Sequence, residues 1–192
     1  MEKIIVLGNG GHAQSIVDTI ECQGEYSIAG YIVNEKVINK HDYPILGCDD
    51  DLEKIYASGI HYAALGIGYL GRGKLRQKLY SQLKTIGYSL PVICDPTSIV
   101  SNKAVIGEGT FIGKGAIINS GAQIGKMCIL NTGSIVEHNC EIGDFTHIAV
   151  GTVLCGDVKI GENTLVGANA TVIQGRSVGS DSIVGAGEVV RK

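Results

Sequence analysis

The chain has 192 residues, enough to bury a substantial core without disulfide or metal staples. Its 16 Lys and Arg against 19 Asp and Glu give a net charge of -3, and the absence of a dense basic cluster argues against a nucleic-acid-binding protein. Glycine accounts for 28 residues, about twice its average share, so part of the chain must form many tight turns.

The first residues carry no signal for export or membrane insertion. Their apolar run, Ile4 to Leu7, ends at Gly8 and is too short for a secretory core or a membrane span. We therefore expect a cytoplasmic protein. The six cysteines form no Cys-x-x-Cys pair, and in a reducing compartment they are expected to be small core residues.

Residues 1–94 alternate short apolar runs with helical patterns. Strands are expected at 3–7, 27–33, 61–67 and 88–93, helices at 12–23 and 74–86, and a helix start at 49–51. This rhythm predicts a small, Rossmann-like parallel α/β domain. Pro91 and Pro96 then interrupt the chain and no proline follows, so we predict two domains, 1–94 and 95–192.

The second domain has an apolar repeat with a period of six residues. It is carried by Val100, Ile106, Ile112, Ile118, Ile124, Leu130, Val136, Ile142, Ile148, Leu154, Ile160, Val166, Val172, Val178, Val184 and Val190. Four residues after each aliphatic from Ile106 to Val166, the residue is small or β-branched: Thr110, Ala116, Ala122, Cys128, Ser134, Cys140, Thr146, Thr152, Val158, Thr164 and Ala170. Both positions are expected to point inward. The dominance of Ile and Val over Leu in this region favours strands.

Glycine often follows the large aliphatic directly, where we expect it to supply the turn conformation. It does so at residues 107, 113, 125, 143, 161, 167, 179 and 185. Hexapeptide periodicity is typical of parallel β-helices, whose coils bury their aliphatic stack against their neighbours. The repeat resembles the left-handed hexapeptide β-helix, with three short strands and 18 residues per coil. The handedness comes from this resemblance, and residues 106–190 would make about five coils.

Histidine is the side chain best suited to accept a proton near neutral pH, and the repeat region contains two, His138 and His147. His138 lies two residues after the inward Val136, at a corner where side chains turn outward. His147 precedes the inward Ile148 and should face out from a flat side. A solvated surface histidine and a histidine packed at a subunit interface are the respective non-catalytic interpretations.

Gly156 follows His138 by one 18-residue coil, so the two should meet at one corner about 5 Å apart along the axis. A base and a backbone N–H could therefore serve one site. His147 lies half a coil from His138, on a different side of the three-sided prism that the β-helix would form. If both histidines serve one site, two subunits must build it.

Two segments together resemble a known family. They are residues 131–156, NTGSIVEHNCEIGDFTHIAVGTVLCG, and residues 8–13, GNGGHA. They are similar to the bacterial sugar acetyltransferases of the left-handed β-helix type. Members of that family N-acetylate UDP-4-amino-4,6-dideoxy sugars, and relatives O-acetylate sialic acid. The resemblance implies acetyl-CoA as co-substrate, no metal, and a homotrimer with active sites between subunits.

The resemblance also implies roles for single residues. His138 would be the general base, His147 would lie near the acetyl thioester, and the N–H of Gly156 would bind its carbonyl oxygen. Backbone at Ala168 and Ala186 would contact coenzyme A. In the amino-terminal domain the residues implied to bind the nucleotide sugar are Gly8, Gly10, Gly11, His12, Asn34, Glu35 and Gly66.

One position departs from the family pattern. Family members usually place an acidic residue after the catalytic histidine, where this chain has Asn139. An amide can orient the ring but adds no charge, so Glu137 or Glu141 is a candidate substitute. The departure also keeps open a non-catalytic protein that binds a nucleotide sugar.

Gly8 to Ala13 matches Gly-x-Gly-x-x-Ala between a strand and a helix, the context of a phosphate-binding turn. Alone, the motif would indicate NAD, but the first 94 residues are closer to one mononucleotide-binding half than to a dinucleotide domain. The non-functional interpretation is a tight turn that needs glycine only for packing. The nucleotide, the sugar and the choice between N- and O-acetylation stay open.

Other enzyme classes fit the sequence less well. Cys140 lies two residues from His138, but its inward position in the repeat favours packing over a role as thiol nucleophile. A γ-type carbonic anhydrase needs three histidines around zinc, and the repeat region has two. Serine and tetrahydrodipicolinate acyltransferases share the prism but not the GNGGHA domain.

Overall fold

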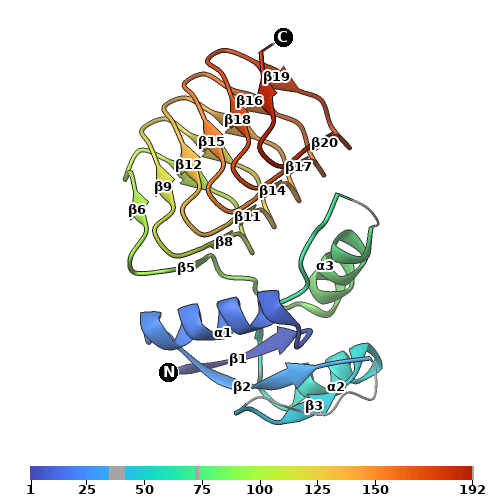
Figure 1. Ribbon diagram of the computed structural model, residues 1–192. Coiled ribbons are helices and arrows are strands. Elements are labelled where there is room, and N and C mark those ends of the chain that lie inside the picture. The colour runs from blue at the N-terminus through green and yellow to red at the C-terminus, as the bar shows by residue number, and fades with distance from the viewer. Residues whose placement is uncertain (35–41, 72–73, 192) are drawn as a thin grey trace. The chain divides into compact units, whose positions relative to one another are not determined.

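The computed structural model describes residues 1–34, 42–71 and 74–191. Figure 1 shows an α/β region followed by a stack of short strands wound into coils. The chain forms two compact units, one of Met1–Gly68 with Gly73–Ile93 and the other of Tyr69–Arg72 with Cys94–Lys192. None of the helices in the described residues has the length and apolarity needed to span a bilayer.

The first unit contains a parallel four-stranded sheet of order β3-β2-β1-β4. Its strands are β1 (Glu2–Leu7), β2 (Tyr26–Ile32), β3 (Ile45–Gly47) and β4 (Tyr62–Leu65). Its helices are α1 (Gly11–Gln23), α2 (Leu52–Ala57) and α3 (Leu75–Ile86), with a 3₁₀ turn over Asp49–Asp51. Strand β1 is central and fully buried from Ile4 to Leu7, as its unbroken apolar run predicts.

Helix α1 begins and ends at glycines. Gly10 is its N-cap, and Gly24 ends it in the left-handed conformation with φ 66°, donating its N–H to Ile20. The helix buries Ala13, Ile16 and Ile20. Because buried positions recur every three to four residues, the face that covers the sheet follows directly from the sequence.

The run expected as a strand at 88–93 behaves differently. Only Ser89 makes an isolated parallel bridge, to Tyr62, and Ile93–Cys94 forms β5, which lies next to β8 in a sheet of the β-helix. Tyr88 is buried and donates its hydroxyl to the carbonyl of Leu52 at 2.9 Å. Burial raises the pKa of Tyr88 to about 12. Tyr88 therefore packs against α2, and Ser89 adds a single bridge beside β4 in place of the expected strand.

The second unit is a parallel β-helix with three flat sheets. After β5 (Ile93–Cys94) the two-residue strands are β6 (Ile99–Val100), β7 (Val105–Ile106), β8 (Phe111–Ile112), β9 (Ile117–Ile118), β10 (Gln123–Ile124), β11 (Ile129–Leu130), β12 (Ile135–Val136), β13 (Glu141–Ile142), β14 (His147–Ile148), β15 (Val153–Leu154), β16 (Lys159–Ile160), β17 (Leu165–Val166), β18 (Thr171–Val172), β19 (Ser177–Val178), β20 (Ile183–Val184) and β21 (Val189–Val190). The sheets have the orders β19-β16-β13-β10-β7, β20-β17-β14-β11-β8-β5 and β21-β18-β15-β12-β9-β6. Each strand pairs with the third one after it, so the period of six builds a triangular coil, without a register slip.

The inward positions are those of the repeat. Every large aliphatic from Ile112 to Val172 is buried, and so is every small residue from Thr110 to Ala170. Buried threonines satisfy their hydroxyls on backbone carbonyls of the next coil, for example Thr146 to Gly161 at 2.8 Å and Thr164 to Gly179 at 2.9 Å. Ile106 and Val178, in the outer coils, are only half-buried because fewer coils cover them.

The glycines that directly follow the large aliphatics were expected to supply the turn conformation, but in the structure they have another role. Gly107, Gly143 and Gly161 lie outside the left-handed region, and a Cβ on any of them would overlap backbone of the next coil. Glycine is therefore required there for close approach of coils. The left-handed turns fall two residues later, at glycines such as Gly109 (φ 66°) and at polar residues such as Asn139 (φ 57°).

Asp95 fixes the first coil of the β-helix. Its carboxylate is buried and accepts hydrogen bonds from the Thr97 N–H at 2.9 Å and hydroxyl at 2.6 Å. Lys114, in the next coil, lies 3.0 Å from the other carboxylate oxygen. Burial alone would raise the pKa of Asp95, but the bonds from Thr97 and the charge of Lys114 lower it to about 2.

Candidate active site

His138 lies at the corner of the prism between β12 and β13, and its side chain is exposed. Gly156 occupies the same corner one coil further, and the N–H of Asp157 donates to the carbonyl of His138 at 3.0 Å. The His138 ring covers Gly156 so closely that a Cβ on residue 156 would overlap Cε1 and Nε2. The structure therefore brings together His138 and Gly156, as their spacing of one 18-residue coil predicts.

The backbone N–H of Gly156 is available to a ligand. It meets no hydrogen-bond acceptor within residues 1–34, 42–71 and 74–191. A backbone donor beside an imidazole nitrogen can bind the oxygen of a thioester while the ring accepts a proton. The corner thus has the two groups that acyl transfer needs.

Asn139 extends this corner through the neighbouring coil. Its amide Nδ2 lies 3.4 Å from Nδ1 of His138 and donates to Oδ1 of Asp157 at 3.2 Å. Both Asn139 and Asp157 adopt the left-handed conformation, with φ of 57° and 61°. Asn and Asp tolerate this conformation better than other residues with side chains. Asp157 was not among the predicted site residues.

The two glutamates considered as substitutes for an acidic residue at 139 are engaged elsewhere. Glu137 accepts the backbone N–H of His138 at 3.3 Å. Glu141 forms an ion pair with Lys159 at 2.8 Å. Neither contact involves the His138 ring.

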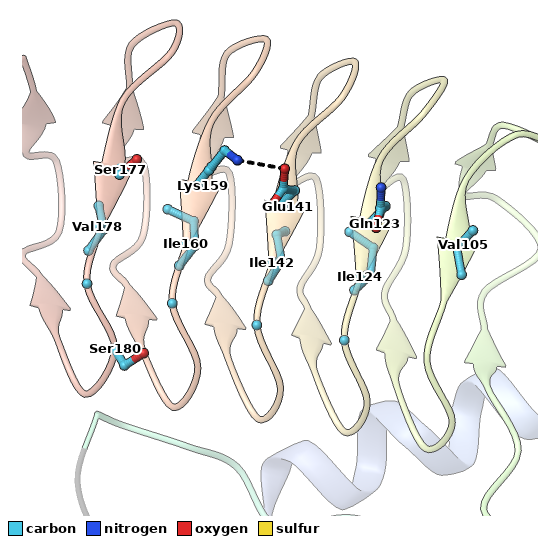
Figure 2. Close-up of a pocket in the computed structure, with 14 residues that line it drawn as sticks. Val105, Gln123, Ile124, Glu141, Ile142, Lys159, Ile160, Ser177, Val178 and Ser180 are labelled. Atoms are coloured by element: carbon cyan, nitrogen blue, oxygen red, sulfur yellow. Dashed lines mark ion pairs between the residues drawn. The ribbon is translucent and has the colours of Figure 1, made fainter.

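Glu141 and Lys159 belong to an open hollow of about 630 Å³ on the outer face of β7, β10, β13, β16 and β19. Figure 2 shows Gln123, Glu141, Lys159 and Ser177 in a row along this face, with a dashed line between Glu141 and Lys159. The row contains no histidine or cysteine, and its ion pair is already satisfied. The hollow therefore lacks the imidazole that the His138 corner supplies.

His147 points outward from β14, as the repeat predicts, but it is only 8% exposed. Its Nδ1 lies 2.7 Å from the carbonyl of Tyr69, and its Nε2 lies 3.2 Å from Nδ2 of Asn131. The Tyr69 hydroxyl in turn donates to the carbonyl of Asn163 at 2.6 Å. A neutral ring that donates from Nδ1 and accepts at Nε2 satisfies both contacts.

Ala168 and Ala186 lie at another corner of the prism, between β17 and β18 and between β20 and β21. Ala168 is half-buried, Ala186 is exposed, and the carbonyl of Ala168 accepts the N–H of Gly187 at 2.8 Å. The N–H groups of Ala168 and Ala186 meet no acceptor among the described residues. Exposed Val150 occupies the same corner one coil before Ala168.

Cys140 is buried in the coil interior, and its Sγ contacts the carbonyl of Cys155 at 3.1 Å. Burial raises the pKa of this thiol to about 11. A thiol that stays protonated at neutral pH is a poor nucleophile. The structure therefore agrees with a packing role for Cys140.

In the first unit, the predicted glycines lie where strand β1 leads into α1. Gly8 has φ 92°, a conformation that favours glycine. Side chains on Gly10 or Gly11 would meet no atom within 4 Å, so a ligand can approach this backbone. Gly66 differs, since a Cβ there would overlap Ala13 and the carbonyl of Leu7, and its glycine lets α1 pack on the sheet.

A cavity of about 300 Å³ opens beside these glycines at the carboxyl edge of the sheet. It is lined by Leu7, Gly8, Asn9, Ile32, Val33, Asn34, Asp49, Ile67, Leu75 and Leu79. Asn34 donates Nδ2 to Asp49 Oδ2 at 2.6 Å and accepts the Asp49 N–H at 3.0 Å. Asp49 is a lining residue that we expected only as a helix start. His12 is half-buried near the start of α1, and Glu35 lies outside the described residues.

Comparisons with known proteins agree with this geometry. The model of the PglD N-terminal domain matches residues 3–83, and that of the hexapeptide repeat of succinyl-transferase matches residues 103–138 and 157–192. PerB of Caulobacter crescentus, solved with CoA and GDP-perosamine, is 32% identical with a TM-score of 0.93, covering 100% of this chain and 90% of its own. This chain belongs to the sugar acetyltransferases of the hexapeptide β-helix type.

A second member of the family gives the same result. The acetyltransferase domain of PglB from Neisseria gonorrhoeae is 27% identical with a TM-score of 0.89, covering 100% of this chain and 92% of its own. The same domain has been solved with acetyl coenzyme A. No curated protein matches the chain. The expectation of a Rossmann-like domain followed by a left-handed β-helix is confirmed.

Proposed function

We propose that this protein transfers the acetyl group of acetyl-CoA to the amine of a nucleotide-linked amino-dideoxy sugar. The observation that carries the proposal is the corner at which the His138 ring covers Gly156, beside a backbone N–H that has no protein acceptor in the described residues. PerB, an N-acetyltransferase solved with CoA and GDP-perosamine, supports the same chemistry in a chain of this architecture.

The reaction needs no covalent enzyme intermediate. The sugar amine attacks the thioester carbonyl carbon while a free ring nitrogen of His138 accepts the amine proton. The N–H of Gly156 stabilises the oxyanion of the tetrahedral intermediate. The carbon–sulfur bond then breaks, and the imidazolium returns its proton to the CoA thiolate.

The first unit would bind the nucleotide. Parallel α/β sheets bind ligands outside the carboxyl ends of their strands, where the cavity lined by Gly8, Asn34 and Asp49 is found. Helix α1 begins at Gly11, and the N-terminus of a helix favours an anionic group such as a diphosphate. The apolar walls from Ile32 and Leu79 suit a flat base.

The active site would be shared by two subunits of a homotrimer. His138 and Gly156 occupy the corner before β13 and β16, whereas Ala168 and Ala186 occupy the corner before β18 and β21. The width of one flat sheet separates these corners within a chain, so coenzyme A along the second corner would meet His138 of a neighbouring copy. His147, on β14 close to the second corner, would lie near the thioester.

The test of the reaction is thiol release from acetyl-CoA with a panel of acceptors. The panel contains UDP- and GDP-linked 4-amino-4,6-dideoxy sugars, CMP-sialic acid and free sialic acid. We expect turnover with a nucleotide-linked amino sugar and a product heavier by one acetyl group. Turnover with sialic acid alone would indicate O-acetylation, and no CoA release from any acceptor would contradict the proposal.

Mixing two inactive variants tests the shared site. His138→Ala removes the base, and Ala168→Trp blocks the second corner of the same chain. If sites form between copies, co-refolded mixtures regain activity because some interfaces combine an intact His138 with an intact Ala168. Mixtures as inactive as both parents would contradict a shared site.

A further inference from the structure

The cavity of the first unit runs across the carboxyl ends of three neighbouring strands. Gly8 and Asn9 line it after β1, Asn34 after β2 and Asp49 after β3. These strands lie side by side in the sheet, so two strand spacings of about 4.8 Å separate the ends of β1 and β3. A diphosphate bound at Gly8 therefore leaves the nucleobase, one ribose further, towards Asn34 and Asp49.

Asp49 is held in place at this end of the cavity. Its N–H donates to Oδ1 of Asn34 at 3.0 Å, and its Oδ2 accepts Nδ2 of Asn34 at 2.6 Å. Its carbonyl accepts Nε2 of Gln82, on α3, at 3.0 Å. Within residues 1–34, 42–71 and 74–191, no donor reaches Oδ1 of Asp49. The cavity is therefore lined by a fixed carboxylate that has an oxygen left for a ligand.

The two aspartates that follow Asp49 have different surroundings. Asp51 accepts the N–H of Cys48 at 2.9 Å and so closes the 3₁₀ turn. Asp50 is exposed and does not line this cavity. Asp49 is thus the acid of this turn whose side chain can meet a ligand in the cavity.

A carboxylate discriminates between nucleobases because it accepts hydrogen bonds and cannot donate them. Guanine presents two adjacent donors, N1–H and N2–H, beside its O6 acceptor. Uracil presents a single donor, N3–H, between two carbonyl oxygens that a carboxylate repels. The second N–H of the Asn34 amide, which Asp49 does not use, suits O6 of guanine.

From this arrangement we infer that Asp49 makes the nucleotide site selective for guanine over uracil. The inference rests on the proposed nucleotide site, and it identifies the acceptor as a GDP-linked amino sugar. Asp49 accepts the two N–H groups of guanine, and hydrogen bonds to a charged group are stronger than neutral ones. A site built on such bonds rejects a ligand that lacks the donors.

Binding of nucleoside diphosphates to the full chain tests the inference by isothermal titration calorimetry. Inosine diphosphate is GDP without the 2-amino group, so it isolates the hydrogen bond from N2–H. We expect GDP to bind about tenfold more tightly than inosine diphosphate and more tightly still than UDP, since each lost bond involves a charged group. UDP that binds as tightly as GDP would overturn the inference.

Asp49→Asn separates recognition of the base from other roles of this side chain. Asparagine keeps the shape and an acceptor for Nδ2 of Asn34, and an unchanged affinity for UDP shows that the site is intact. The affinity for GDP should fall about tenfold, and the preference over inosine diphosphate should disappear. Asp50→Asn, the matched control, should change none of the three affinities. Equal losses for all three nucleotides would place Asp49 against the ribose and overturn the inference.

These binding measurements contain no acetyl-CoA and no sugar, so they do not depend on catalysis. A chain that prefers GDP but releases no CoA with any acceptor would contradict the proposed reaction and support the guanine site. A chain that acetylates a UDP-linked amino sugar in preference to its GDP-linked counterpart would support the reaction and overturn the guanine site.

Discussion

The ring of His138 covers the Cα of Gly156, which lies one coil further along the same corner of the β-helix. The contact explains the glycine, because any side chain at residue 156 would displace the ring. It also places a backbone donor beside the imidazole. Two residues that are distant in the sequence thus form one unit of the site.

Gly156→Ala tests this contact. The added methyl group overlaps Cε1 and Nε2 of His138 and must push the ring away. We expect kcat to fall about 10²-fold, because a displacement of the base by about 1 Å is enough for such a loss. Steady-state kinetics measures it, with Gly179→Ala as control, since a Cβ there meets its nearest atom at 3.8 Å. A kcat close to that of the wild type would contradict the contact.

Asp95→Asn should weaken the β-helix at neutral pH. The pKa of Asp95 is lowered from 3.8 to about 2 in the folded protein, so its stabilisation is present above pH 3.8 and is lost as the pH falls towards 2. The shift corresponds to about 2 kcal/mol.

Urea unfolding at pH 7 and pH 3 measures this effect. Asp95→Asn should reduce stability at pH 7 and flatten its decline towards pH 3. Glu141→Gln, which breaks an exposed ion pair with Lys159, should have little effect. An unchanged acid dependence in Asp95→Asn would argue against this carboxylate as the source.

Cys140→Ala should keep catalysis. The thiol is buried and its pKa of about 11 keeps it protonated at neutral pH, so it cannot serve as a nucleophile. We expect kcat within about threefold of the wild type, with some loss of stability from the smaller side chain. Iodoacetamide labelling followed by mass spectrometry should modify exposed Cys22 and spare Cys140. Inactivation that tracks Cys140 labelling would contradict a packing role.

His147→Ala should act on both stability and acetyl-CoA binding. Removal of the ring leaves the Tyr69 carbonyl and the Asn131 amide without this partner, at a cost of about 1–3 kcal/mol. If His147 also lies near the thioester, the KM for acetyl-CoA rises. Tyr69→Phe removes the bond to Asn163 and should lower stability without that change in KM. If His147→Ala and Tyr69→Phe change the KM for acetyl-CoA equally, His147 has only a structural role.

Much of this architecture can be predicted from the sequence. The period of six determines which side chains point inward. Each hexapeptide has one large aliphatic and one small residue at fixed positions, and these two side chains fill the interior of the coil. The meeting of His138 and Gly156 follows from the 18-residue coil alone. Regular repeats make distant contacts predictable, since each coil touches only its neighbours.

Contacts outside the repeat could not be predicted in this way. The cover over His147 comes from Tyr69, which lies 78 residues away in a segment without periodicity. Asp49 lines the cavity of the first unit and accepts a hydrogen bond from Asn34. No sequence motif predicts this contact. The contact between Asn139 and Asp157 is different, because the two residues lie one 18-residue coil apart and the repeat alone brings them together.

The central claim is that His138 accepts the proton of the sugar amine, and His138→Ala tests it most directly. Initial rates of thiol release are compared for the wild type, His138→Ala and Gln174→Ala, a variant at the same corner one coil beyond Gly156. A loss in kcat of about 10² to 10⁴ in His138→Ala alone is the expected result for a general base. A His138→Ala enzyme that retains more than about a tenth of the wild-type kcat would contradict the claim.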